Sequence, residues 1–239
     1  MHLVADIGNT FLKLAVFADD RIIEQWTADV NDIACVEHAL QKYPTIKSGV
    51  LSTVAAPNSR LNALLPWLIL DTDTALPFEN GYGSPKTLGM DRIAAVAGAH
   101  ALYPHKDVLV IDLGTCIKYN LILKSGVFKG GAISPGIRMR FKALNTFTDR
   151  LPLLDTSWPN DFCAASTDAS LQSGVLFGAL FEMIGMVDSY KHDHPSLLVL
   201  LTGGDAALFE DKLKMSIFVH PELNLIGLHS ILKNHVAQR

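Results

Sequence analysis

Apolar residues along the chain fall into short runs separated by turns that contain glycine and aspartate, and the order of these runs occurs twice. Three runs near the N-terminus are separated by short polar turns, and three runs in the second half follow the same order. The six runs lie at residues 3–7, 11–17, 22–26, 108–112, 117–123 and 127–131. Short apolar runs bounded by turn residues are typical of buried strands. Two strand–turn–strand–turn–strand units in matching order therefore predict a duplicated fold.

The rest of each half alternates between helical and strand patterns. Apolar residues at spacings of three and four predict helices, and short uninterrupted apolar runs predict strands. The predicted helices lie at residues 31–42, 90–103, 168–190, 206–214 and 223–235, and the predicted strands at 48–54 and 197–201. Pro104 ends one of these helices, and the polar stretch 104–107 marks a boundary. The pattern predicts two α/β domains, residues 1–105 and 106–239.

Composition narrows the class of protein. The chain has 239 residues, 49% of them hydrophobic, which is enough for one large core or two small ones. The formal net charge of -4 provides no basic surface for nucleic acid. The three cysteines are widely spaced and form no CxxC pair, so neither a disulfide framework nor a zinc site is expected. Free thiols of this kind fit a reducing cytosol.

Two further features bear on location. The chain starts with a strand pattern and not with a signal peptide. Its longest apolar segment, residues 174–187, contains Glu182 and is shorter than the roughly 20 residues that span a bilayer. We therefore expect a cytoplasmic protein that binds neither nucleic acid nor membrane.

Two of the predicted strands end in the same polar turn. Residues 6–10 read Asp-Ile-Gly-Asn-Thr and residues 112–115 read Asp-Leu-Gly-Thr. Glycine lets the backbone approach a phosphate oxygen, threonine offers a hydroxyl, and aspartate can hold a cation directly or through water. One such turn alone is most simply the polar end of a strand. Because the turn recurs in equivalent places of a repeated unit, we interpret both as phosphate-binding turns facing a nucleotide cleft.

A second candidate site is the segment 82–92, in which a glycine-containing loop leads into an alanine-rich helix. The pattern places Asp91 and Arg92 in the first helical turn, where free N–H groups and the helix dipole stabilise a carboxylate. Asp91 could accept a proton from a substrate hydroxyl, and Arg92 could bind a substrate carboxylate with two hydrogen bonds. Taken alone, the segment is also an ordinary charged helix start.

Two glycine-rich loops complete the set. Residues 130–136 contain three glycines and a proline, and they fit a substrate or phosphate loop as well as a tight structural turn. Residues 202–205, Thr-Gly-Gly-Asp, join an apolar strand to a helical pattern, where the glycines leave room for a nucleoside. Neither GxxxxGK[ST] nor GxGxxG occurs in the chain, which disfavours a P-loop kinase and a dinucleotide enzyme.

Taken in order, these motifs resemble those of the bacterial type III pantothenate kinases over nearly the whole chain. The matching motifs are DxGNT at 6–10, the tyrosine-to-GxDR segment at 82–92, DxGT at 112–115, GGxIxPG at 130–136 and TGGD at 202–205. The family belongs to the actin and sugar-kinase superfamily. The resemblance implies two ribonuclease H-like domains with mixed sheets around a central cleft.

The resemblance also implies an activity and a set of site residues. The expected enzyme uses ATP to phosphorylate the primary hydroxyl of pantothenate to 4′-phosphopantothenate, the first step of coenzyme A synthesis. Asp91 is then the expected general base. The pantothenate-binding positions are Tyr82, Gly89, Met90, Asp91, Arg92 and Thr167. The ATP-binding positions are Asp6, Ile7, Gly8, Asn9, Thr10, Phe11, Leu12, Lys13 and Thr115.

Cofactors and assembly follow from the same resemblance. Magnesium is expected with ATP, near Asp6, and a monovalent cation, potassium or ammonium, is expected at Asp112. The family forms homodimers whose interface helps to shape the pantothenate pocket, so a homodimer is expected here.

One departure from the family pattern follows the second turn. The family commonly continues with small residues and then a threonine, whereas this chain has Cys116, Ile117 and Lys118. If the Lys118 side chain points into the cleft, it could contact phosphate or reduce the reliance on the monovalent cation. If it points away, it is a surface strand residue.

Two other functions compete with the kinase assignment. One is another small-molecule kinase of the same superfamily, which would keep the phosphate turns but change the segment 82–92. The other is a non-catalytic nucleotide-binding regulator. The intact Asp6, Asp91 and Asp112 argue against a regulator, and the acidic net charge argues against direct DNA binding.

Overall fold

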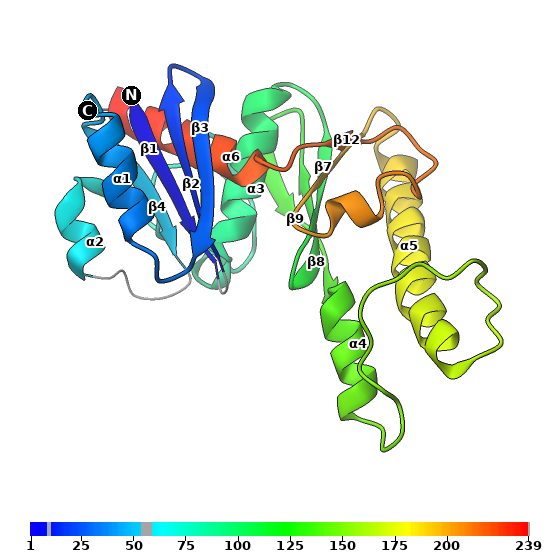
Figure 1. The fold of residues 1–239 in the computed structure, drawn as a ribbon. Coiled ribbons are helices and arrows are strands. Elements are labelled where there is room, and N and C mark those ends of the chain that lie inside the picture. Colours follow the sequence, from blue (N-terminus) through cyan, green and yellow to red (C-terminus); the bar gives the residue numbers. More distant parts are fainter. Residues whose placement is uncertain (9–10, 54–58, 239) are drawn as a thin grey trace. The chain divides into compact units, whose positions relative to one another are not determined.

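The structure is a computed structural model that describes residues 1–8, 11–53 and 59–238 (Figure 1). These residues form two compact units. Unit 1 comprises Met1–His105, Ser125–Phe128 and Glu222–Arg239, and unit 2 comprises Lys106–Lys124 and Lys129–Pro221.

Unit 1 is built on a five-stranded sheet with the strand order β3-β2-β1-β4-β5. The strands are β1 (His2–Ile7), β2 (Phe11–Ala18), β3 (Arg21–Asp29), β4 (Ser48–Thr53) and β5 (Trp67–Ile69). The first three form an antiparallel meander, whereas β4 is parallel to β1 and β5 is parallel to β4. Leu3, Leu14 and Leu51 of this sheet are fully buried and form a core with α1 (Ala34–Lys42) and α2 (Ser59–Leu64).

Unit 2 repeats the same strand order, as β9-β8-β7-β11-β12. Its strands are β7 (Val108–Leu113), β8 (Cys116–Ile122), β9 (Val127–Gly130), β11 (Leu198–Thr202) and β12 (Phe218–Val219). As in unit 1, the first two strands pair antiparallel and the last two join in parallel. This repeat of strand order confirms the predicted duplicated fold. Two short strands are additions: β10 (Ile133–Pro135) pairs with β8, and β6 (Glu79–Asn80) pairs with the part of β9 that belongs to unit 1.

The C-terminal helix α6 (Leu223–Ala237) belongs to unit 1, so the predicted second domain of residues 106–239 is wrong at its end. The helix packs against α3 (Met90–Leu102). A Cβ atom on Gly227 would overlap the carbonyl of Ala94 and lie 2.6 Å from the backbone nitrogen of Gly98. The two helix backbones therefore touch, which ties the end of the chain to the first unit.

Helix α5 (Thr167–Asp193) covers one face of the unit 2 sheet, and it is longer than the predicted helix at 168–190. The sequence did not predict α4 (Ile137–Thr146), because Ile137 and Phe141 are its only buried residues. The predicted helix at 206–214 is wrong. Only Ala206–Leu208 is helical, as a single 3-10 turn, and the apolar residues after it are buried through successive tight turns.

Among the described residues, α5 is long and apolar enough, by length and composition, to cross a membrane. One such helix is weak evidence, because the core helix of a compact protein passes the same test. Leu176, Ala179 and Met183 of α5 are fully buried in the core of unit 2. We therefore interpret α5 as a core helix.

Candidate active site

The first polar motif starts near the end of β1, which pairs with β2 in unit 1. Asp6 lies near the end of β1, directly opposite Lys13 of β2 in the antiparallel register. The N–H of Gly8 donates a hydrogen bond of 3.0 Å to the carbonyl of Phe11. The register therefore places Asp6 and Lys13 opposite each other, with their side chains on the same face of the sheet.

The remaining positions of this turn differ in what they can offer a ligand. The Leu12 side chain is only 2% exposed and belongs to the core, so Leu12 can contact a phosphate only through its backbone. Ile7 also packs against this core. Asn9 and Thr10, both expected to contact ATP, lie outside the described residues.

Tyr82 and Arg92, from the two ends of the segment 82–92, meet in unit 1. The guanidinium carbon of Arg92 lies 5.1 Å from the centroid of the Tyr82 ring and 5.7 Å from that of Phe128. The Arg92 Nη1 atom is 3.5 Å from the Tyr82 hydroxyl oxygen, and the two aromatic rings are stacked. Arg92 is 4% exposed. A planar guanidinium held against two rings is well suited to bind a carboxylate with two parallel hydrogen bonds.

Asp91 lies in the first turn of α3, as the sequence predicts. Its Oδ1 accepts a hydrogen bond of 2.9 Å from the N–H of Arg92, and its carboxyl group folds back over Gly89, the residue that caps the helix start. Free N–H groups at a helix start stabilise a carboxylate. The structure thus brings together Gly89, Met90, Asp91, Arg92 and Tyr82, the expected pantothenate positions of unit 1.

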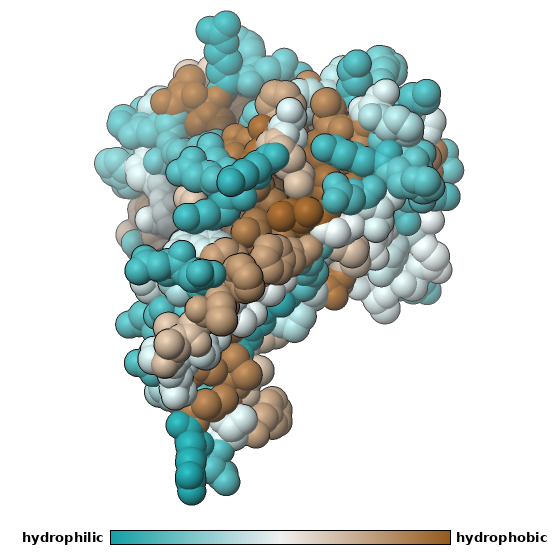
Figure 2. Space-filling model, turned by 90° about the vertical axis from the view of Figure 1, so that its right-hand side faces the viewer, coloured by the Kyte–Doolittle hydropathy of each residue, from teal (hydrophilic) through white to brown (hydrophobic). Residues whose placement is uncertain are grey.

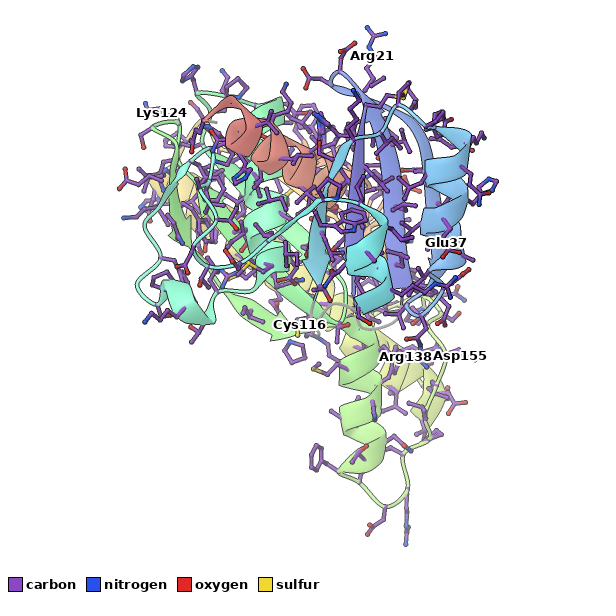
Figure 3. All side chains as sticks on the ribbon, turned by 90° about the vertical axis from the view of Figure 1, so that its left-hand side faces the viewer. Arg21, Glu37, Cys116, Lys124, Arg138 and Asp155 are labelled. Carbon is purple, nitrogen blue, oxygen red and sulfur yellow. The ribbon has the colours of Figure 1, made fainter. Side chains whose placement is uncertain are left out.

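In unit 2, the glycine-rich loop 130–136 lies against the second polar turn. The N–H of Gly136 donates a hydrogen bond of 3.2 Å to the carbonyl of Thr115, and β10 pairs with the start of β8. Figure 3 labels Cys116, the first residue of β8, and Arg138, an exposed residue in the first turn of α4. Arg138 was not predicted as a site residue, because a single charged residue after a loop is common and indicates no particular function.

The motif 202–205 also contacts this second polar turn. The N–H of Asp205 donates a hydrogen bond of 3.0 Å to the carbonyl of Leu113. Gly203 has a φ of +93°, which favours glycine. A Cβ atom there would also lie only 2.7 Å from Oδ1 of Asp112, so glycine is required for space as well. Burial raises the pKa of the Asp205 carboxyl group. The three glycine-containing motifs of unit 2 therefore form one site around residues 112–115.

Asp112 is buried in this site and is paired with Lys118. The two residues face each other in the antiparallel register of β7 and β8, and Nζ of Lys118 lies 2.6 Å from Oδ2 of Asp112. The side chains are 14% and 8% exposed, respectively. Lys118 therefore points toward the second polar turn, which settles the orientation that the sequence left open.

This pair does not fit a monovalent cation held by the same carboxylate oxygen. A cation there would stand close to the ammonium group, and two unit positive charges about 4 Å apart repel by about 4 kcal/mol at an effective dielectric constant near 20. The ammonium group already supplies one positive charge at contact distance from Asp112.

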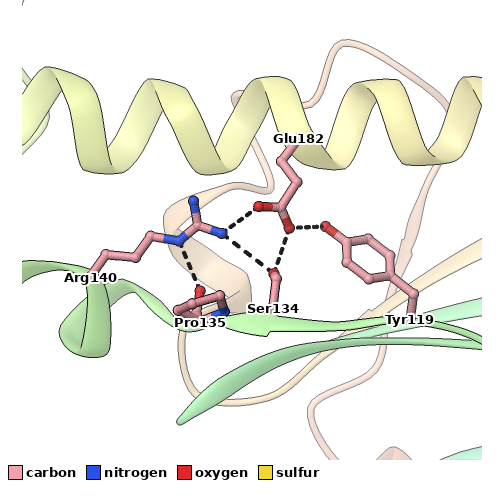
Figure 4. Close-up of polar contacts among 5 residues, drawn as sticks. All are labelled: Tyr119, Ser134, Pro135, Arg140 and Glu182. Carbon is pink, nitrogen blue, oxygen red and sulfur yellow. Dashed lines mark hydrogen bonds and ion pairs between the residues drawn. The ribbon is translucent and has the colours of Figure 1, made fainter. Parts of the chain in front are cut away.

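A polar cluster that includes Ser134 and Pro135 of the loop 130–136 was not predicted from the sequence (Figure 4). Glu182 of α5 accepts hydrogen bonds from the hydroxyl groups of Ser134 and Tyr119, over 2.5 and 2.9 Å, and forms an ion pair with Arg140 of α4. Arg140 also donates to the carbonyl of Pro135. The cluster ties β8, β10, α4 and α5 together and so fixes the loop next to Thr115. A glutamate inside an apolar helix pattern was the one available signal.

The pKa values of this cluster follow from its hydrogen bonds. Burial alone would raise the pKa of Glu182, but the hydrogen bonds from Ser134, Arg140 and Tyr119 outweigh burial and hold this pKa below its ordinary value. Burial raises the pKa of Tyr119, and the hydrogen bond to Glu182 raises it further.

Thr167 lies at the start of α5 in unit 2, next to Ser166, whose hydroxyl oxygen accepts a hydrogen bond from the N–H of Ala169. Thr167 lines a surface hollow of about 580 Å³ together with Leu151, Ala164 and Ser170. The structure therefore places Thr167 in a different unit from Tyr82 and Arg92.

Within the described part of the chain, no group of three or more His, Cys, Asp or Glu side chains could hold a metal ion. Magnesium needs no such group, because it is commonly bound by one or two carboxylates together with substrate phosphates and water. The Asp6 carboxylate at the end of β1 fits that mode of binding.

Comparisons with known proteins identify the family of this chain. Residues 2–189 match the family model of type III pantothenate kinase. A type III pantothenate kinase of Phocaeicola vulgatus is 42% identical over 97% of this chain and 98% of its own length. One from Christiangramia forsetii is 43% identical over the full length of both chains. This chain belongs to the type III pantothenate kinase family.

Solved structures confirm the fold of this type III pantothenate kinase. A Campylobacter jejuni protein described as a conserved Baf family transcriptional activator has a TM-score of 0.63 and is 22% identical over 98% of this chain and 99% of its own. Component A of the Acidaminococcus fermentans (R)-2-hydroxyglutaryl-CoA dehydratase has a TM-score of 0.55 at 13% identity, over 98% of both chains. At these identities the likeness concerns the fold alone, and it agrees with duplicated ribonuclease H-like domains.

Proposed function

We propose that this chain transfers the γ-phosphoryl group of ATP to the primary hydroxyl of pantothenate, which gives 4′-phosphopantothenate for coenzyme A synthesis. The observation that carries the proposal is the arrangement of the segment 82–92 in a chain of this family. Asp91 lies at a helix start beside a buried Arg92 that is held against Tyr82. A kinase that phosphorylates an uncharged sugar would have no substrate carboxylate for Arg92 to bind.

Each residue of the segment has a role in this reaction. The Asp91 carboxylate orients the attacking hydroxyl and accepts its proton as the bond to phosphorus forms. Arg92 binds the carboxylate of pantothenate, and Tyr82 keeps the guanidinium plane in place. The backbone of Gly89 and Met90 borders the same position.

The two polar turns bind the triphosphate. Phosphoryl transfer depends mainly on alignment and on neutralisation of the phosphate charge. In unit 1, the backbone around Gly8 aligns the phosphates and Lys13 neutralises part of their charge. In unit 2, the hydroxyl of Thr115, beside the loop 130–136, aligns them by a hydrogen bond. Asp6 would hold a magnesium ion that accompanies ATP and neutralises the β- and γ-phosphates.

We also propose that the enzyme is a cytoplasmic homodimer that pairs through the exposed side of α5. Gly174, Gly178 and Gly185 lie on this side with open space above them. Phe181 lies among them and is 57% exposed, and its ring is 5.9 Å from that of Phe177. Figure 2, which views the molecule from the side where α5 lies, shows apolar side chains between hydrophilic ones. Apolar surface of this kind is typical of a protein interface.

The test of the activity is an assay of the purified protein with ATP and magnesium, in which ADP release and the phosphorylated product are both measured. We expect ADP release with pantothenate and none with a panel of sugars. Release with a sugar alone would assign the chain to another kinase of the superfamily. Absence of turnover with every substrate would favour a regulator.

A further inference from the structure

The Lys118 side chain lies directly beside the Asp112 carboxylate. Residues 112 and 118 are direct partners in the hairpin of β7 and β8, so their side chains project from the same face of the sheet. The distance of 2.6 Å between Nζ and Oδ2 is that of a charge-assisted hydrogen bond. Ile133 of β10 pairs with Lys118 from the other edge, which holds the lysine backbone in place.

A buried carboxylate needs a compensating positive charge, and its source can be either solvent or the chain itself. With a neutral residue at position 118, Asp112 would need a cation drawn from solution. With lysine there, the charge is covalently attached and is present in every molecule. The ε-ammonium group carries the same charge as potassium or ammonium ion, and like ammonium it can donate several hydrogen bonds.

We propose that the ε-ammonium group of Lys118 replaces the monovalent cation at Asp112, so that this enzyme works without potassium or ammonium ions. The proposal rests on the kinase activity proposed above. It makes Lys118 a positioning residue, because it acts through Asp112 on the turn 112–115 that faces the phosphates.

The first experiment measures the initial rate of the wild-type enzyme while potassium chloride replaces choline chloride at constant ionic strength. We expect the rate to change by less than about twofold, because Lys118 already supplies the positive charge. The constant ionic strength keeps electrostatic screening the same in both salts. A stimulation of many-fold by potassium or ammonium would overturn the proposal.

The second experiment uses the variant Lys118→Thr, which restores the residue type common in the family. Without potassium we expect its rate to fall about 100-fold, the usual effect of losing one preorganised electrostatic contact. Added potassium or ammonium should restore much of the rate. The variant Lys118→Arg keeps the charge and should stay indifferent to both ions, as should Lys124→Thr, which changes an exposed lysine in the turn after β8 (Figure 3).

A third readout does not depend on activity. A ligand that binds only the folded state raises the melting temperature. Potassium should therefore raise the melting temperature of Lys118→Thr relative to the same concentration of choline, and it should leave that of the wild type unchanged. The opposite pattern, or a Lys118→Thr variant as active and as stable as the wild type without potassium, would overturn the proposal. If no pantothenate is phosphorylated in any salt, the proposed activity fails, and the melting temperatures alone decide the role of Lys118.

Discussion

Asp91 is the residue on which the proposed chemistry depends most directly. Replacing Asp91 with Asn keeps its shape and its hydrogen bond to the N–H of Arg92 but removes the proton acceptor. We expect kcat to fall by about 10²- to 10⁴-fold, the usual contribution of a general base. Binding of ATP, measured by calorimetry, should stay close to that of the wild type. A variant that turned over at nearly the wild-type rate would show that another group accepts the proton.

A substitution of Arg92 tests its proposed role in binding pantothenate. Lysine keeps the positive charge but loses the planar fork that lies against the Tyr82 ring. For Arg92→Lys we expect the KM for pantothenate to rise about 10- to 100-fold, with little change in the KM for ATP. The matched variant Tyr82→Phe keeps the ring and should raise the KM for pantothenate much less. Equal increases of both KM values would contradict a role in pantothenate binding.

At the residue scale, the sequence predicts best the positions of residues that lie within one short motif. The positions of Asp91 and Arg92 in the first turn of α3 follow from a loop that leads into an alanine-rich helix, and the structure confirms them. The contact of Lys118 with Asp112 depends on the register of a hairpin, which periodicity alone leaves undetermined. The partners of Glu182 come from β8, β10 and α4, and no local pattern links these segments.

Among the secondary-structure elements, α5 packs on its sheet through apolar residues, and Glu182 adds polar contacts with β8, β10 and α4. The variant Glu182→Gln removes the charge that Arg140, Ser134 and Tyr119 contact. Glutamine keeps an acceptor oxygen for these partners, so the bonds weaken from charged to neutral and are not all lost. We expect a loss of about 1–3 kcal/mol in total in the free energy of unfolding at neutral pH. Asp188→Asn, an exposed substitution on the same helix, is the matched control and should change stability little.

The stabilisation by Glu182 also depends on pH, and the direction of this dependence follows from its pKa. The pKa of Glu182 in the folded protein lies below its ordinary value of 4.5, so the unfolded chain binds this proton more readily. The stabilisation is therefore complete above about pH 4.5 and is lost as the pH falls through the lower, folded-state pKa. Denaturant titrations over this range should show a flatter pH dependence for Glu182→Gln than for the wild type. Identical slopes would contradict the assignment.

The elements themselves were predictable to different degrees for physical reasons. The strands β1, β2, β7 and β8 have apolar runs bounded by turns, and the structure confirms them. The segment 206–214 carries apolar residues at helical spacing, but Phe209 and Leu213 are buried through tight turns and not on a helix face. Apolar periodicity reports which residues are buried, and the backbone can satisfy the same burial in more than one way.

At the scale of the whole molecule, the duplication was visible in the sequence because each unit starts with the same hairpin and turn. The strand order β3-β2-β1-β4-β5 recurs in unit 2. Membership of α6 was not visible, because an amphipathic helix shows which face is buried but not which core it joins. That information lies in the contact of Gly227 with Ala94 of α3, two positions far apart in the sequence.

The exposed side of α5 gives a prediction about assembly. Placing a charge at Phe181 should separate the proposed dimer, because the ring lies between glycines that would allow a second helix to approach closely. We expect Phe181→Glu to sediment as a monomer at concentrations at which the wild type is a dimer. The control Ile23→Glu, on an exposed apolar position of β3 in unit 1, should stay dimeric. A wild-type monomer would refute the dimer itself. A dimeric Phe181→Glu variant would place the interface elsewhere, since a buried unpaired carboxylate at the centre of an interface is strongly unfavourable.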